Sequence, residues 1–295
     1  MAGAGKVMGL CWWALKIAVV LMVGLGLEGS QCAEFNDFFY PSWAEDHVMY
    51  EGQTLKLRLD NTSGAGFASK STYLFGKAYV QIKLVPGDSA GTVTAFYMSS
   101  QGDQHDEFDF EFLGNKSGEP YIVQTNVYSK GVGNREQRLY LWFDPTQDFH
   151  SYSFLWNRHQ VVFMVDDVPV RVFKNKENET GVAYPQRQAM GVFSSIWNAD
   201  DWATQGGLVK TEWSHAPFIA TYRNFSIDAC EYRGPPSISD CSTSSSLWWD
   251  RPAYASLDGK QRVKLRWVQN KYMIYDYCRD STRFSTPQPE CAQRV

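Results

Sequence analysis

The sequence lacks a basic stripe, an internal repeat and any pair of cysteines spaced as C-x2-C. Its 295 residues carry 28 Lys and Arg against 32 Asp and Glu, a net charge of −4. Nucleic-acid-binding domains present clustered positive charge, so this balance argues against nucleic acid as a partner. The missing C-x2-C spacing argues against a zinc site, and no metal is expected. The chain is long enough for one large domain with a sizeable core, or a domain with an appendage.

Long apolar runs are lacking beyond the N-terminus. The stretch Ile17–Leu27 follows Lys6 and Lys16 and precedes small and polar residues. A membrane-spanning helix needs about 20 apolar residues, whereas the apolar region of a secretory signal peptide runs about 7–15. Residues 1–33 therefore predict a signal peptide, cleaved near 26–33. The expected product is secreted and extracellular, with no membrane association after cleavage.

Cysteine is absent between residues 33 and 229. Two of the six cysteines fall in or beside the signal peptide, and four lie in the last quarter of the chain: Cys230, Cys241, Cys278 and Cys291. Four cysteines allow three pairings. Short local loops are the simplest of them, and secretion favours disulfides over free thiols.

Long helical patterns are absent from residues 34–229. Gln53–Leu59 alternates apolar and polar residues, as a half-buried strand does. Asp166-Asp167 between two apolar runs predicts a hairpin turn. Further strands are expected at Lys77–Leu84, Thr92–Tyr97, Tyr121–Val127, Arg138–Phe143, Ser151–Trp156, Val161–Val165 and Val170–Phe173. Short strands at regular spacing predict an all-β sandwich, and 15% aromatic residues suit both such a core and a surface that stacks on sugar rings.

The character of the chain changes at residues 230–295. Gly234–Ser246 is rich in Pro, Ser and Gly and predicts a loop. Within Ala255–Tyr277, apolar residues recur at helical spacing: Val263, Trp267, Val268, Tyr272 and Tyr275. We therefore expect a C-terminal extension with one helix packed on the sandwich and a disulfide-stapled tail.

The most informative segment is His105–Phe112, H-D-E-F-D-F-E-F. On a strand, successive side chains point to opposite faces. One face therefore carries the phenylalanines and belongs in the core. The other carries Glu107, Asp109 and Glu111 and must face an accessible groove, because unpaired carboxylates resist burial. His105 has the same parity and is expected to flank the groove.

The spacing of the acids indicates a chemistry. Glu107 and Glu111 have Cα atoms roughly 13 Å apart, and side chains that lean together bring their carboxyls to about 5–5.5 Å. That is the separation in a retaining glycosidase, whereas straight side chains approach the wider inverting range. Asp109 between them is expected to share a proton and to hold the two glutamates in different protonation states. A cation site or plain surface charge is the alternative.

At this point the sequence resembles a known family. His105–Gly114 (HDEFDFEFLG) resembles the signature H-D-E-I-D-F-E-F-L-G of the xyloglucan endotransglucosylase/hydrolases, which are related to bacterial lichenases. Trp197–Gly207, Trp213–Phe218, Trp267–Tyr277 and the four late cysteines match in order. Phe108 stands where the family more often has Ile, on the core face, so packing and not chemistry should change.

The resemblance implies a jelly-roll, concanavalin A-like glucanase fold and specific roles. Glu107 is then the nucleophile, Asp109 the helper and Glu111 the general acid/base, with no cofactor. Asn115 is the expected glycosylation site, and the implied disulfides are Cys230–Cys241 and Cys278–Cys291. The expected glucan contacts are His105, Gln124, Asn126, Asn134, Arg135, Glu136, Trp197, Asp201, Trp202, Gly206 and Arg283. Taken singly, Trp197 and Trp202 suit the core as well as the cleft.

The resemblance also bears on the fate of the cleaved chain. Hydrolases of this family carry a longer loop near the cleft and diverge from W-N-A-D-D-W-A-T, whereas this chain keeps that run with no insertion around 174–190. We therefore expect a secreted cell-wall (apoplast) enzyme, a monomer, that moves xyloglucan onto a xyloglucan or oligosaccharide acceptor. A xyloglucan or mixed-linkage glucan endohydrolase and a lectin-like binding protein are the alternatives.

Overall fold

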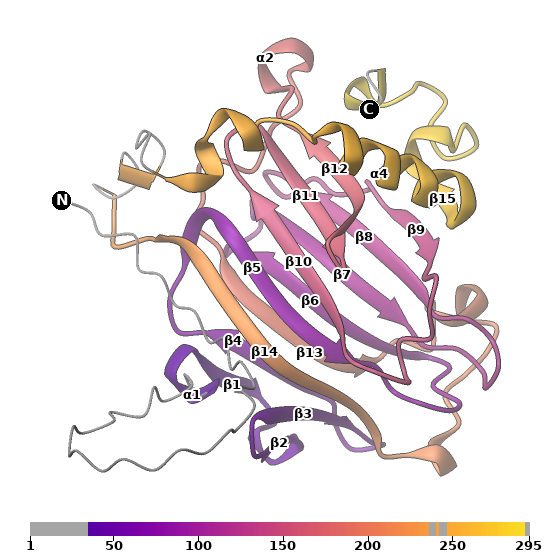
Figure 1. Cartoon of the computed structure of the whole chain (residues 1–295). Helices are drawn as coiled ribbons and strands as arrows, with labels where there is room; N and C mark the ends of the chain where they lie inside the picture. The colour runs from indigo at the N-terminus through magenta and orange to yellow at the C-terminus, as the bar shows by residue number, and fades with distance from the viewer. Residues whose placement is uncertain (1–34, 236–239, 242–246, 293–295) are drawn as a thin grey trace, which may run out of the picture.

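The computed structural model describes residues 35–235, 240–241 and 247–292. Within them the strands form two antiparallel sheets, of eight and seven strands, that pack face to face (Figure 1). The predicted all-β sandwich is confirmed. The signal-peptide prediction for residues 1–33 lies outside the described residues. In the part of the chain that is described, no helix has the length and apolar character needed to cross a membrane.

The eight-stranded sheet contains, in spatial order, β1 (Phe39–Trp43), β4 (Ala65–Ser69), β13 (Gly191–Asn198), β6 (Thr92–Ser99), β7 (Glu107–Leu113), β8 (Ile122–Tyr128), β9 (Gln137–Tyr140) and β15 (Met273–Asp276). The seven-stranded sheet contains β12 (Val168–Lys174), β11 (Gln160–Val165), β10 (His150–Trp156), β5 (Tyr73–Lys83), β14 (Phe218–Glu231), β3 (Thr54–Leu59) and β2 (Val48–Glu51).

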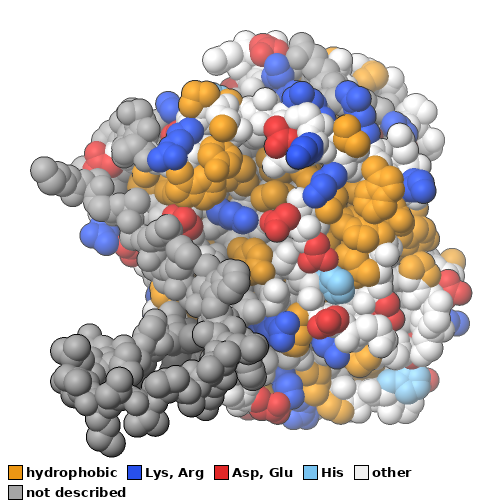
Figure 2. All heavy atoms as spheres, in the orientation of Figure 1, with side chains coloured by type: hydrophobic (Ala, Val, Ile, Leu, Met, Phe, Trp, Pro, Cys, Tyr) orange, Lys and Arg blue, Asp and Glu red, His pale blue; other side chains and the backbone are white. Residues whose placement is uncertain are grey.

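Figure 2 shows charges of both signs interspersed on one face of the molecule, without a basic stripe on that face.

Aromatic packing between the sheets holds β7 in place. Phe108, Phe110 and Phe112 are fully buried. Their rings meet Phe154 and Tyr152 of β10 at centroid distances of 4.6–5.8 Å, mostly edge to face. Such pairs contribute about 0.5–1.5 kcal/mol each beyond the area they bury. The alternation in the sequence therefore fixes which face of β7 looks outward.

Two local predictions can be compared with the structure directly. Asp166 and Asp167 both have positive φ, 46° and 56°, as the two central residues of a type I′ hairpin turn do, which confirms the β11–β12 hairpin. Helix α4 (Gly259–Lys271) begins at a capping box formed by Asp258 and Gln261. The short helices α1 (Phe35–Phe38) and α2 (Glu177–Thr180) come just before β1 and just after β12, which are edge strands of the two sheets.

The predicted buried face of the C-terminal helix was partly wrong. α4 packs against β12 through Leu265 and Val268, as expected of an appended helix. Val263, however, is 65% exposed, and Tyr275 lies on β15, beyond the end of the helix. Tyr275 was misplaced because α4 ends at Lys271, where Tyr272 leaves helical geometry, so the 3.6-residue period does not continue. Val263 lies inside α4, on a side other than the one that buries Leu265 and Val268.

The C-terminal extension is part of the sandwich. β15 pairs with β9 and so adds a strand to the edge of the eight-stranded sheet, near α4 (Figure 1). The disulfides implied by the resemblance, Cys230–Cys241 and Cys278–Cys291, are both present. The extension thus lengthens the face that carries the acidic row of β7.

Candidate active site

Three carboxylates project in one row from the outer face of β7, which lies between β6 and β8. Asp109 is 6% exposed, while Glu107 and Glu111 are half-buried. Neighbouring strands place Tyr97 and Asn126 opposite Asp109, and Gln124 opposite Glu111. The three acids therefore lie together on the face of β7 opposite the phenylalanines.

Burial raises the pKa of all three carboxyls. It is the largest cause for Glu107 and for Glu111, which also feels the charge of Glu107. The pKa of Asp109 lies well above its ordinary value of 3.8, first because of burial and then because Glu111 and Glu107 flank it. One oxygen of Asp109, Oδ1, is buried and accepts no hydrogen bond from the described residues. Repulsion between like charges, the cause expected from the sequence, thus ranks second to burial.

A hydrogen-bond relay approaches Glu111 from the neighbouring strands. Gln124 on β8 donates from Nε2 to Oε2 of Glu111. Arg138 on β9 donates from Nε to Oε1 of Gln124, at 2.7 Å. The charge of Arg138 lowers the pKa of Glu111, as does the hydrogen bond from Gln124, so both oppose the effect of burial. Groups on two other strands therefore oppose the burial that raises the pKa of Glu111.

A cleft of about 560 Å³ opens beside Glu111. It brings together five residues that the sequence predicted for the site: Glu111, Gln124, Glu136, Trp202 and Arg283. It also contains four that sequence reasoning missed: Tyr128, Arg138, Tyr275 and Asp280. The sequence offered a signal for two of these residues. Tyr128 lies two residues after the predicted contact Asn126, and Arg138 lies two residues after Glu136, so each is expected to share a face with its predicted neighbour.

The C-terminal tail supplies one wall of this cleft. Arg283 donates to Oε2 of Glu136 at 2.7 Å and to Oδ1 of Asn134 at 2.6 Å. Asn134 has a positive φ of 64°, a conformation that Asn tolerates better than most residues. The three predicted contacts are therefore held as one cluster between the β8–β9 connection and the tail.

The loop after β13 supplies the opposite side. Trp197 and Trp202 are both half-buried and pack on a small apolar cluster that includes Val93 and Leu113. Asp201 and Gly206 are exposed on the same loop. The side-chain position of Gly206 faces open space at a positive φ of 68°. Rings that are half core and half surface suit an aromatic wall of a carbohydrate groove.

His105 flanks the acidic row, as its parity predicted. Its ring stacks on Tyr128 at 5.1 Å between centroids, and its charge lowers the pKa of Glu107. The neighbouring Asp106, the fourth acid of the run, points the other way and is 2% exposed. It accepts hydrogen bonds from the backbone of Lys130 and the hydroxyl of Ser129. Asp106 therefore anchors the loop after β8.

The predicted glucan contact of Arg135 needs correction. Its side chain is 9% exposed, forms an ion pair with Glu290 at 2.7 Å and donates to the carbonyls of Val127 and Val132. These partners occupy the guanidinium inside the protein, which leaves a structural role. Oδ1 of Asn126 likewise accepts from the backbone N–H groups of Arg135 and Val127, so the amide also braces the loop.

Asn115 lies two residues after the end of β7 and is half-buried. Its Nδ2 donates to the carbonyl of Pro120 and its Oδ1 accepts from the backbone of Lys116.

Among the residues that the structure describes, no group of three His, Cys, Asp or Glu side chains is arranged to hold a metal ion.

A β-sandwich that carries a row of partly buried carboxylates beside a cleft has the arrangement expected of a glycosidase. Residues 35–215 match the model of the glycosyl hydrolases family 16, and residues 243–291 match the model of the xyloglucan endo-transglycosylase C-terminus. The chain belongs to family 16 of the glycosyl hydrolases and, within it, to the xyloglucan endotransglucosylase/hydrolases.

Relatives along the whole length agree. The chain is 61% identical over 277 residues to xyloglucan endotransglucosylase/hydrolase protein 9 of Arabidopsis thaliana, covering 94% of this chain and 95% of that one. It is 58% identical to xyloglucan endotransglucosylase protein 6 of Diospyros kaki, covering 96% of each.

Solved structures share the fold. The Crh5 transglycosylase superposes with a TM-score of 0.56 at 25% identity, covering 69% of this chain and 82% of that one. The Bacillus licheniformis β-glucanase, at 22% identity and a TM-score of 0.52, covers 64% of this chain and 91% of the glucanase. The second likeness concerns the fold alone.

Asp109→Asn is expected to separate stability from activity. Because the pKa of Asp109 is raised, the folded state binds more protons than the unfolded chain above pH 3.8, and stability falls as pH rises through that window. Removing the charge should therefore raise Tm at about pH 7 by a few degrees, since about 1 kcal/mol moves Tm by roughly 2–4 °C at this size. Near pH 3.5 the gain should shrink to about zero. Activity should fall by about 10²-fold.

Calorimetry at the two pH values and a glucan transfer assay would check this. The exposed Asp103 gives the matched control, because Asp103→Asn should change neither quantity. A lower Tm for Asp109→Asn at neutral pH would contradict the raised pKa.

Proposed function

We propose that the chain cleaves the β-1,4-glucan backbone of xyloglucan with retention and transfers the fragment to another xyloglucan chain. The observation that carries this is the row of acids, with Glu107 and Glu111 on either side of Asp109 on one half-buried strand face. Family membership supplies the substrate class.

The roles follow from position and environment. Glu107 attacks the anomeric carbon and forms a covalent glycosyl ester as the glycosidic bond breaks, while Glu111 protonates the departing oxygen. Glu111 then takes the proton from the incoming 4-hydroxyl, whose oxygen displaces Glu107. Asp109, flanked by both, keeps a proton within reach of either carboxylate. No cofactor takes part.

Transfer competes with water, so it requires an acceptor held at high effective concentration. The wall formed by Arg283, Glu136 and Asn134 extends the cleft beyond Glu111 and supports an acceptor site there. Trp202 lines the same cleft. A xyloglucan chain or oligosaccharide bound in this cleft holds its 4-hydroxyl next to the glycosyl-enzyme, so the hydroxyl reacts with the ester faster than water does.

The proposal extends to the setting of the enzyme. Residues 1–33 act as a signal peptide, the mature protein of residues 34–295 works in the cell wall as a monomer, and Asn115 carries a glycan. The catalytic unit is 34–229, and 230–295 complete the acceptor side. Peptide mapping of protein secreted from plant cells would test the cleavage site and the glycan together.

One assay separates the candidate activities. The protein is incubated with xyloglucan, with and without a labelled xyloglucan oligosaccharide. Label that enters polymer is the expected result. New reducing ends without label transfer would make the protein a hydrolase, and binding with neither would make it lectin-like.

A further inference from the structure

A row of small residues leads from Glu111 to the far edge of the eight-stranded sheet. Glu111 lies opposite Ala95 on β6, and Ala95 lies opposite Ser195 on β13. Ser195 lies opposite Gly66 on β4, which lies opposite Trp43 on β1. Directly opposed residues of antiparallel strands share a face, so this row continues the groove on the side away from Arg283.

Aromatic side chains border that row. Tyr97 and Phe193, two residues along from Ala95 and Ser195, stack with ring centroids 5.1 Å apart. Trp197 stands two residues beyond Ser195 on the other side. The small residues therefore lie between aromatic side chains on both sides, an arrangement that fits an extended sugar chain.

Trp43 lies at the end of this row. An ideal Cβ on Gly66 would lie 2.4 Å from Nε1 of Trp43, and one on Gly64 would lie 3.0 Å from Cη2. The indole thus lies over Gly66 of β4 and close to Gly64 just before that strand, and a side chain at Gly66 would leave it no room. A bulge between Pro41 and Trp43 shifts the register so that the side chain reaches this place. Despite these contacts Trp43 remains 42% exposed.

We propose that Trp43 forms a distal donor subsite, which stacks on a sugar ring of the donor glucan far from the cleaved bond. This rests on the proposed function, which puts the acceptor at Arg283 and hence the donor on the β1 side. From β7 to β1 there are four strand-to-strand steps of 4.7–4.9 Å, about 19 Å in all. Only donors of several glucosyl units beyond the cleaved bond reach Trp43.

The test compares donors of increasing length with one labelled acceptor. For Trp43→Ala, kcat/KM should fall about five- to tenfold on polymeric xyloglucan, the scale of one lost aromatic contact, and stay unchanged on the shortest donor that is cleaved. Trp43→Phe should restore most of the loss. Tyr50→Ala is the matched control, because Tyr50 is a comparably exposed aromatic, 45%, on β2 of the other sheet.

A second measurement does not depend on turnover. In a Glu107→Ala background, calorimetric titration with xyloglucan oligosaccharides should show that Trp43→Ala weakens binding of long oligosaccharides and not of short ones. A length-dependent loss of binding would support the subsite even if the wild-type protein transferred no label, a result that would refute the proposed function alone. Equal losses at all lengths, or none with polymer, would overturn the subsite.

Discussion

Glu107→Ala is expected to abolish both transfer and hydrolysis, with activity lowered by about 10⁴-fold or more, as for other enzymes that lose a covalent nucleophile. The ester that retains configuration cannot form without this carboxylate. The protein should remain folded, because Glu107 projects from the outer face while Phe108 and Phe110 hold β7. Label transfer and release of reducing ends would both be measured, with far-UV circular dichroism to verify folding.

Glu111→Ala is the matched control, since the two glutamates differ in role and not in type. On a donor whose leaving group departs without protonation, Glu111→Ala should form the glycosyl-enzyme in a rapid burst and then turn over slowly, because the base for the acceptor hydroxyl is missing. Glu107→Ala should show no burst on that donor. Added azide should enter the space left at Glu107 and give a product of inverted configuration. Comparable activity of both variants on the activated donor would refute the assignment of roles.

The fold was predictable where one periodicity ran through a whole element. The alternation of Phe108, Phe110 and Phe112 with the acids gave the burial of β7 correctly. At the C-terminus two periods meet, because α4 ends at Lys271 and β15 begins at Met273. A single helical pattern drawn through both therefore placed Tyr275 wrongly.

The residue types of the candidate site were predictable from the sequence, whereas the neighbours that each residue meets on other strands were not. The pairing of β7 with β6 and β8, which joins Tyr97 and Gln124 to the acids, depends on long-range register that one sequence does not display. The predicted pKa cause was repulsion, while burial ranks first, because burial reflects neighbours from the whole sheet. Arg135 was misplaced for the same reason, since its partner Glu290 lies 155 residues away in sequence.

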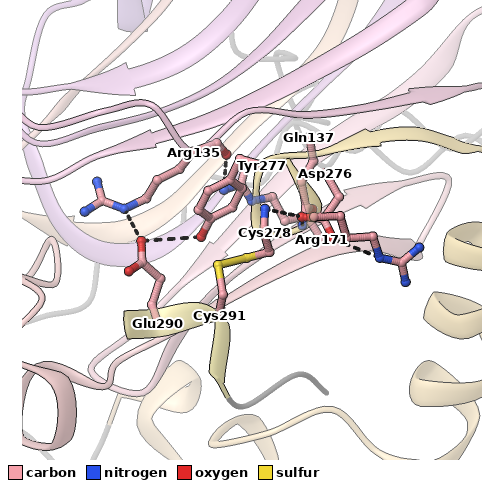
Figure 3. The surroundings of a disulfide bond; sticks show 9 residues. Arg135, Gln137, Arg171, Asp276, Tyr277, Cys278, Glu290 and Cys291 are labelled. Atoms are coloured by element: carbon pink, nitrogen blue, oxygen red, sulfur yellow. Dashed lines mark hydrogen bonds and ion pairs between the residues drawn. A yellow bond between two sulfur atoms is a disulfide. The ribbon is translucent and has the colours of Figure 1, made fainter. Parts of the chain in front are cut away.

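That partnership gives the largest expected effect on stability. The carboxylate of Glu290 lies between Arg135 and the hydroxyl of Tyr277, beside the Cys278–Cys291 disulfide (Figure 3). The side chains of Arg135 and Glu290 are only 9% and 7% exposed. Glu290→Ala leaves a buried guanidinium without its counter-charge, which destabilises a protein by about 3–5 kcal/mol.

At roughly 2–4 °C per kcal/mol, Tm should fall by about 6–20 °C in scanning calorimetry. Glu51→Ala is the control, because Glu51 pairs with Lys56 at the surface, is 63% exposed and should change stability by less than about 1 kcal/mol. The double variant Arg135→Met with Glu290→Leu should recover most of the loss, since it leaves no unpaired charge. A drop for Glu290→Ala no larger than the Glu51 control would mean that the pair is effectively solvated.

The same variant connects stability to the site. The backbone N–H of Arg135 donates to Asn126, and the adjoining Asn134 and Glu136 hold Arg283 on the acceptor side. When Arg135 loses its anchor, this wall loosens while the acidic row on β7 keeps its own support. Below its unfolding temperature, Glu290→Ala should therefore raise KM for the acceptor more than it lowers the rate of hydrolysis. An equal loss of both would place the effect on the whole fold instead of the wall.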